Sequence, residues 1–171
     1  MNISRKSTGI GIGIVALAII CGVAMNWYLN PDRSLARSWA GFIYSIEDRD
    51  AGAVAAYLDK DYSDSWGYSQ ATLTGDLRRI MYSFKQLKLT LDDVTVTRDG
   101  SEAIITARVK MSANGYGYVD DAMRQVNGLT DPFVLRWKRK GAMSSGWTVV
   151  RIEQPKFDAS RYGPRKHGFS F

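Results

Sequence analysis

The chain has 171 residues, enough for one globular domain with an ordinary core and one additional segment. Its formal net charge is +6, but Arg5, Lys6 and a basic stretch at 155–171 hold most of that charge, so the body of the chain is nearly neutral. Because nucleic-acid binding requires a concentrated basic face, this distribution argues against a nucleic-acid partner. Because Cys21 is the one cysteine in the sequence, an intramolecular disulfide and a cysteine-based metal site are excluded.

Residues 1–29 predict a membrane anchor. Residues 1–8 are polar and form the expected cytoplasmic N-terminus, and residues 9–29 are mainly apolar over about 20 positions, which matches the hydrocarbon thickness of a bilayer. Trp27 and Tyr28 suit the membrane–water interface, and the positive charge ahead of the apolar run favours export of the C-terminal part of the chain. We therefore expect a single-pass membrane protein whose C-terminal domain is periplasmic or extracellular.

Two other interpretations of residues 9–29 stay open. A signal peptide could end after Ala24, where small residues fit a peptidase site. A lipoprotein signal would use Cys21, although Ile20 is bulkier than the residue usually found before such a cysteine. All three interpretations place the domain outside the cytoplasm.

The domain is predicted to begin with three helices. The first follows the breaker Asn30-Pro31-Asp32 and carries an apolar stripe at three- and four-residue spacing, made of Leu35, Trp39, Phe42, Ile43 and Ile46. Asp50 is expected to cap a short second helix. Ser69 is expected to cap a third, whose stripe comprises Leu73, Leu77, Ile80, Met81 and Phe84.

After the third helix the apolar period changes to two, which predicts strands. Residues 87–91 alternate apolar and polar side chains, and the phase then slips by one at Asp92-Asp93. Since a one-residue slip turns every later side chain to the other face, we expect a β-bulge at Asp92-Asp93 that bends the strand. A turn at 98–101 joins it to a return strand over 103–111.

The remaining predicted elements are shorter. Residues 119–129 suit a short helix, and strands are expected to start at Phe133 and Trp147. The tail at 155–171 is basic, interrupted by glycine and proline, and expected to be flexible. The domain itself is therefore predicted to occupy residues 32–154.

Three stretches resemble the nuclear-transport-factor-2-like (NTF2-like) superfamily, also called the SnoaL-like or cystatin-like cone. They are the turn from Tyr57 to Tyr62, the hairpin from Asp93 to Val109 with its Asp99-Gly100 turn, and the strand from Trp147 to Ile152. The resemblance covers residues 32–154 and implies an α+β fold with a conical pocket. Three N-terminal helices would pack on a curved, mainly antiparallel four-stranded sheet, here preceded by one transmembrane helix. The superfamily includes ketosteroid isomerases, polyketide cyclases and non-catalytic binding or assembly domains, so the fold does not select a function.

Aromatic residues are the candidates for lining this pocket. Tyr62, Trp66 and Tyr68 lie in the loop expected to border the cone. The full predicted set of ligand-pocket residues is Trp39, Tyr57, Tyr62, Trp66, Tyr82 and Trp137. In the opposing interpretation these side chains simply fill the cone as core.

Few residues support catalysis. The one histidine, His167, lies in the tail, which argues against a histidine-dependent site. A carboxylate–tyrosine site would have to combine Asp61 or Asp64 with one of three tyrosines, Tyr44, Tyr57 and Tyr82. We expect instead that the acids cap loops and that no residue is catalytic. No motif predicts a bound cofactor or metal ion.

These features predict a membrane-anchored, non-catalytic binding or scaffold domain on the exported side. It would bind a small apolar ligand or subunits of an envelope complex, and the alternative is a ketosteroid-isomerase- or polyketide-cyclase-like enzyme. Apolar Ile104, Val134 and Val150 on the outer sheet face predict a homodimer through the sheet. A further interpretation is that the basic tail at 155–171 binds anionic envelope polymers.

Overall fold

The computed structural model describes residues 30–141 and 146–159. The predicted anchor at 9–29 and most of the predicted basic tail therefore lie outside the described residues. Within the described part, no helix is long and apolar enough to cross a membrane.

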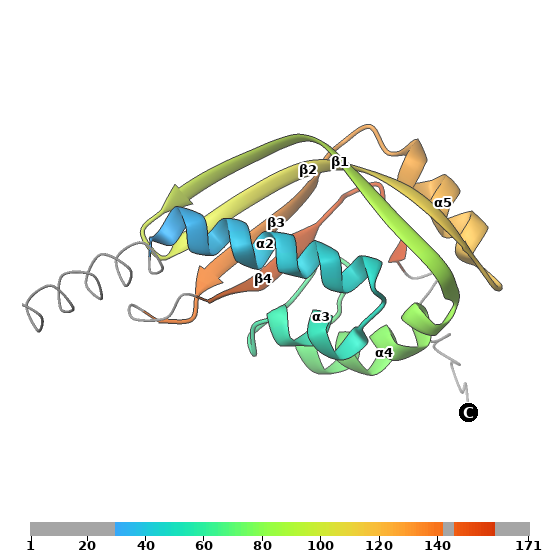
Figure 1. The fold of residues 1–171 in the computed structure, drawn as a ribbon, viewed down its shortest axis with the longest axis horizontal. Helices are drawn as coiled ribbons and strands as arrows, with labels where there is room; N and C mark the ends of the chain where they lie inside the picture. Colours follow the sequence, from blue (N-terminus) through green and yellow to red (C-terminus); the bar gives the residue numbers. More distant parts are fainter. Residues whose placement is uncertain (1–29, 142–145, 160–171) are drawn as a thin grey trace, which may run out of the picture.

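Helices and one sheet make up the described domain (Figure 1). In chain order the elements are α2 (Pro31–Glu47), α3 (Ala51–Tyr57), α4 (Gln70–Tyr82), β1 (Phe84–Asp99), β2 (Glu102–Gly115), α5 (Val119–Gly128), β3 (Phe133–Arg139) and β4 (Trp147–Glu153). The strands form an antiparallel sheet in the order β1-β2-β3-β4. The sheet curves around α2, whereas α3 and α4 lie near the C-terminus of α2 and α5 packs on β2. The predicted α+β class, with three N-terminal helices and a four-stranded sheet, is confirmed.

Side chains cap the first three helices at their predicted starts. Asn30, Asp50 and Ser69 each accept hydrogen bonds from backbone amides in the first turn of α2, α3 and α4. These bonds satisfy donors that no preceding carbonyl reaches. The third helix ends earlier than its apolar stripe predicted, because Phe84 already pairs with Gly115 at the start of β1.

The expected β-bulge lies at Asp92-Asp93. Asp92 pairs with Arg108, but the next pair along the strands is Thr95 with Thr106, so β1 carries an extra residue there. Asp93 adopts a left-handed φ of 50°, and its carboxylate forms an ion pair with Arg108. The extra residue restores the phase of the apolar side chains, and the predicted bulge is confirmed.

The apolar core consists of two clusters. The larger lies between the first three helices and the sheet, and it includes the fully buried Trp137, Trp147 and Val149. The smaller lies between α5 and the ends of β1 and β2, and it includes Met111 and Val119. This division leaves space between the clusters, and that space is the cavity of the candidate site.

The chain stays packed beyond the predicted domain end. The side-chain amide of the buried Gln154 donates to the carbonyl of Asp131 at 2.8 Å. The carbonyl of Phe157 then accepts the indole N–H of Trp66 at 2.8 Å. Residues 155–159 are thereby held against the domain, which differs from the flexible tail expected there.

Lowering the pH is expected to reduce the stability that Asp59 contributes in the loop after α3. Its carboxylate accepts the backbone N–H of Asp61 at 3.0 Å and the hydroxyl of Thr148 at 2.9 Å. The hydrogen bond from Asp61 is the main reason that the pKa of Asp59 lies below its usual value of 3.8. A carboxylate with a lowered pKa stabilises the fold above that usual value, and the contribution is lost as the pH falls through the folded-state pKa.

We therefore expect Asp59→Asn to be less stable than the wild-type chain at neutral pH, and the difference to shrink below about pH 4. Urea unfolding at a series of pH values measures it. Asp61→Asn is the control, because it leaves the backbone N–H of Asp61 in place. An Asp59→Asn difference that stays constant down to about pH 2.5 would contradict this role of the carboxylate.

Candidate functional site

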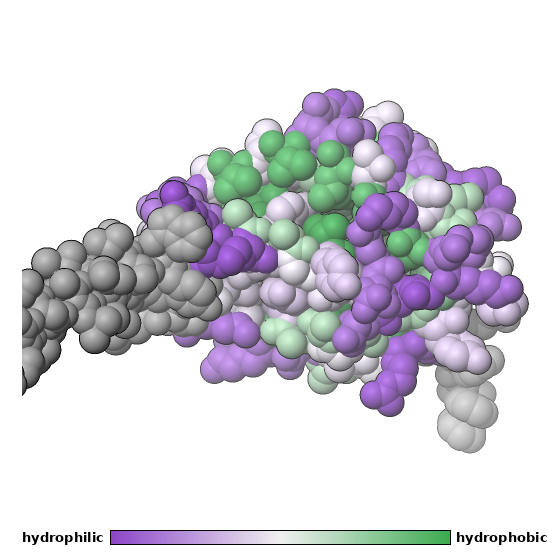
Figure 2. All heavy atoms as spheres, viewed as in Figure 1, coloured by the Kyte–Doolittle hydropathy of each residue, from purple (hydrophilic) through white to green (hydrophobic). Residues whose placement is uncertain are grey.

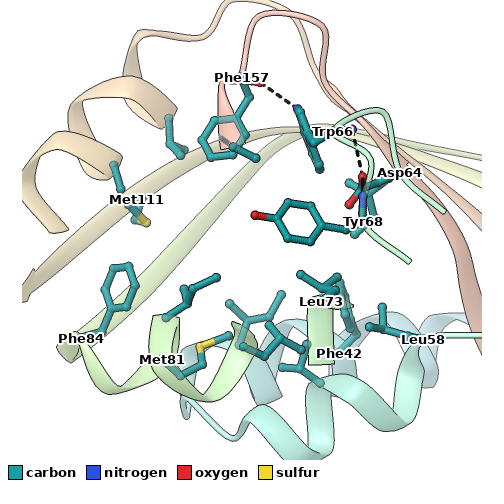
Figure 3. Close-up of a pocket in the computed structure, with 18 of the residues that line it drawn as sticks. Phe42, Leu58, Asp64, Trp66, Tyr68, Leu73, Met81, Phe84, Met111 and Phe157 are labelled. Carbon is teal, nitrogen blue, oxygen red and sulfur yellow. Dashed lines mark hydrogen bonds between the residues drawn. The ribbon is translucent and has the colours of Figure 1, made fainter. Parts of the chain in front are cut away.

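An apolar cavity of about 280 Å³ opens between the two core clusters (Figure 3). Its lining combines side chains of all four helices with the loop before α4 and the segment after β4. Phe42, Leu58, Leu73, Met81, Phe84 and Met111 are among the apolar residues that face it. The volume is close to the lower end of the range for small-molecule pockets, about 300–1,000 Å³. The cavity therefore suits a small apolar molecule.

Asp64 is the carboxylate in the described lining, and it organises the loop before α4. One of its oxygens accepts the backbone N–H groups of Trp66 at 2.9 Å and Tyr68 at 2.8 Å. The other oxygen accepts the hydroxyl of Tyr62 at 3.1 Å. Asp64 is itself buried, so these three bonds provide the partners that a buried carboxylate needs. Both oxygens are thus engaged in holding the loop.

Two tyrosines of this loop have different roles. Burial raises the pKa of Tyr62 well above its ordinary value, with a further contribution from Asp64, so its hydroxyl stays a donor to that carboxylate. Tyr68 points its ring and hydroxyl into the cavity (Figure 3). Burial raises the pKa of Tyr68 as well, so this hydroxyl is also protonated at neutral pH. Among the described residues no side chain or backbone group hydrogen-bonds to the Tyr68 hydroxyl, which leaves it available to a ligand.

Aromatic side chains border the cavity where the chain leaves β4. The rings of Trp66 and Phe157 meet edge to face, with centroids 5.5 Å apart. The centroid of the Phe157 ring also lies 6.0 Å from the centroid of the Phe133 ring. Ala159 completes this side of the lining. The segment after β4 is therefore part of the site.

The structure places two of the six predicted pocket residues in the cavity lining. Tyr62 and Trp66 line it, and so does Tyr68 from the same aromatic loop. Their contact with a ligand stays a prediction.

The other four predicted residues lie outside the cavity. The rings of Trp39 and Trp137 pack edge to face with their centroids 6.2 Å apart. The ring of Tyr57 packs against that of Phe42 with a centroid separation of 5.8 Å. Tyr82 is 86% exposed on α4. Aromatic composition predicted all six alike, but three of these four are used to fill the larger cluster and one faces solvent.

Most of the lining was not singled out by the sequence. Leu73, Leu77 and Met81 belong to the apolar stripe of α4, and such a stripe predicts burial without distinguishing a cavity wall from a filled core. Phe157 was missed because it lies beyond the predicted end of the domain. The aromatic loop before α4 was the one local signal that pointed to the site.

The predicted carboxylate–tyrosine pair is not assembled. Asp64 lines the cavity with its oxygens engaged, and Asp61 is exposed. Tyr44 is 68% exposed, and neither Tyr57 nor Tyr82 lines the cavity. No group of histidine, cysteine, aspartate and glutamate within the described residues could hold a metal ion.

Known structures share this fold. Bd1075 from Bdellovibrio bacteriovorus is similar with a TM-score of 0.56 and 10% identity, over 73% of this chain and 41% of that one. A candidate scytalone dehydratase of Novosphingobium aromaticivorans is similar with a TM-score of 0.53 and 15% identity, over 77% of this chain and 85% of that one. An NTF2-like protein of unknown function from Pseudomonas putida is similar with a TM-score of 0.51 and 14% identity, over 75% of this chain and 88% of that one.

No family model and no curated protein matches the chain. At such low identities the structural likeness shows the fold alone. This chain spans less than half of Bd1075. The chain has the curved-sheet cone fold of NTF2-like proteins, which the sequence resemblance implied.

Proposed function

We propose that this chain is a non-catalytic binding domain that holds a small apolar ligand in the cavity. The observation that carries the proposal is a cavity of about 280 Å³ lined almost wholly by aliphatic and aromatic side chains. Apolar ligand atoms that leave water for such a site contribute about 25 cal/mol for each Å² buried. The chemistry of the lining therefore supports a binding role.

Tyr68 suggests what kind of ligand fits. Its hydroxyl lies inside the cavity and could hydrogen-bond to one carbonyl or hydroxyl group of a bound molecule. No lysine or arginine is part of the described lining, so an anionic ligand would find no countercharge and would be repelled by Asp64. The cavity favours a neutral molecule with a single polar group.

The geometry favours binding over the isomerase- or cyclase-like alternative. General acid–base catalysis needs a carboxylate or imidazole that can exchange a proton with the substrate. Asp64 already accepts three hydrogen bonds from its own loop. An enzyme of that kind would require the loop to rearrange before Asp64 could act.

We further propose that residues 9–29 anchor the domain on the exported side of a membrane. The length of the apolar run, together with Trp27 and Tyr28 at its end, supports this proposal. An anchored domain could also present a surface to subunits of an envelope complex. The outer face of the sheet is also a proposed homodimer surface, because it carries the half-buried apolar residues Ile104, Val134 and Val150.

Filling the cavity is expected to weaken ligand binding while the domain stays folded. Ala122 is buried in the α5 wall, and Ala122→Phe would place a ring in the cavity. We expect the neutral dye N-phenyl-1-naphthylamine to bind this variant at least about tenfold more weakly than the wild type, a loss of about 1.4 kcal/mol. A fluorescence titration measures the difference.

The matched control is Ala71→Phe, which adds the same ring at an exposed position of α4. This variant should bind the dye as the wild-type chain does, and thermal unfolding should show that both variants fold. Equal dye binding by the two variants, or no dye binding by the wild-type chain, would show that the cavity is not the binding site.

A further inference from the structure

A strip of apolar side chains on β1 is exposed at the end of the domain where α2 begins. Val96 pairs with Ile105 and Leu91 with Val109, so these β1 side chains share the inner face of the sheet with the core. The helices leave Val94 43% exposed and Val96 56% exposed. We call Leu91, Val94 and Val96 the β1 strip. Figure 2 shows apolar side chains gathered over this part of β1.

The β1 strip lies next to the first turn of α2. Arg98 Nε contacts Asp32 Oδ1 at 2.6 Å, which joins the end of β1 to the start of α2. Val96 precedes Arg98 by two residues, a separation of about 7 Å along a strand. The apolar run at 9–29 leads into α2 through Asn30 alone, so no linker separates them.

We propose that the β1 strip docks onto the surface of a lipid bilayer, an inference that rests on the proposed anchoring by residues 9–29. Without a linker, an anchored domain has the first turn of α2 at the lipid headgroups. The headgroup layer is roughly 5–8 Å thick on each side of the hydrocarbon core. Val94 and Val96 then lie within reach of the membrane interface, where exposed apolar side chains are buried favourably.

The charge at this end of the domain also suits anionic lipids. The end of β3 belongs to the same region, because Lys138 pairs with Glu102 beside the β1–β2 turn. Basic residues here outnumber acidic ones: Arg33, Arg37, Arg98, Lys138, Arg139 and Lys140 lie among Asp32, Asp59, Asp99 and Glu102. Basic side chains close to an anionic leaflet add electrostatic attraction to the apolar contact.

Strand pairing with a second copy is a poorer fit to the β1 strip. β1 is an edge strand, but the outward N–H of Leu89 already donates to Glu47 Oε1 at 2.8 Å. The bulge at Asp92-Asp93 bends the edge within the strip itself, between Leu91 and Val94. A second chain would therefore meet an occupied amide and an irregular edge, whereas a lipid surface needs neither a free edge nor a register.

The test uses the full chain with Cys21→Ser, reconstituted in mixed phosphatidylcholine and phosphatidylglycerol vesicles. One introduced cysteine carries the environment-sensitive fluorophore NBD, and lipids with a nitroxide on the upper acyl chain quench it on contact. Val96→Cys reports on the β1 strip. Thr97→Cys is the matched control on the opposite face of the sheet, and Tyr82→Cys reports on an exposed position of α4.

We expect the nitroxide lipids to quench the label at Val96→Cys at least about twofold more than the label at Thr97→Cys or Tyr82→Cys. Equal quenching at all three positions, in chains that float with the vesicles, would overturn the docking and leave the anchor intact. Chains that do not float with the vesicles would overturn both. A blue-shifted emission from Val96→Cys without lipid quenching would mean that a second copy covers the strip, and the proposal would be wrong.

Discussion

Asp64→Ala is expected to lower the free energy of unfolding by about 3 kcal/mol, because it removes the acceptor of three hydrogen bonds around a buried group. The donors are the backbone N–H groups of Trp66 and Tyr68 and the hydroxyl of the buried Tyr62. An unsatisfied buried donor costs about 1–3 kcal/mol, but water entering from the cavity can reach part of this loop. Urea unfolding followed by circular dichroism measures the change.

Two further variants make the result specific. Asp64→Asn keeps an amide oxygen for the two backbone N–H groups, so we expect it to cost about 1 kcal/mol. Asp61→Ala removes an exposed carboxylate from the same loop and is expected to change stability by less than about 0.5 kcal/mol. If Asp64→Ala cost no more than Asp61→Ala, the loop would not depend on this carboxylate. Asp64 would then again be a candidate for proton transfer with a bound molecule.

Gly115→Ala and Gly75→Ala are expected to change stability in opposite directions. A Cβ at Gly115 would lie 2.1 Å from the carbonyl oxygen of Ser83 and 3.0 Å from the Cα of Phe84. Both are backbone atoms at the junction of α4 and β1, so we expect a loss of about 2–4 kcal/mol. Gly75 lies in α4, and a Cβ there would meet no atom within 4 Å, so alanine should stabilise the helix by about 0.5–1 kcal/mol.

The same pair of variants connects this junction to the cavity. The Ser83 carbonyl accepts the N–H of Tyr116 at 2.8 Å, and Phe84 lines the cavity. A shift at Gly115 therefore displaces part of the cavity wall, and we expect weaker binding of the naphthylamine dye by Gly115→Ala. Gly75→Ala should bind the dye as the wild-type chain does. Equal stability of the two variants would show that the α4–β1 junction tolerates a side chain.

Patterns within a few residues were sufficient to predict the elements and the bend in the sheet. Ser69 and Asp50 indicated helix starts because a cap bonds to amides of its own first turn. The slip at Asp92-Asp93 indicated the bulge, because a strand with period two has to gain a residue to keep its apolar side chains on one face. The α+β class followed from these local rules and from the resemblance to NTF2-like proteins.

The site depends on contacts between segments that are far apart in the chain. Trp66 lines the cavity whereas Trp137 fills the core, although the sequence predicted both alike as pocket-lining aromatic residues. Phe157 closes the cavity because its carbonyl bonds to Trp66, a residue 91 positions earlier. Residue type and spacing predict that a side chain leaves water, because the hydrophobic effect is non-directional and depends on the apolar area of that side chain. Whether it meets a packed core or an open cavity is set by the shapes of its neighbours, and those are brought together only in the folded domain.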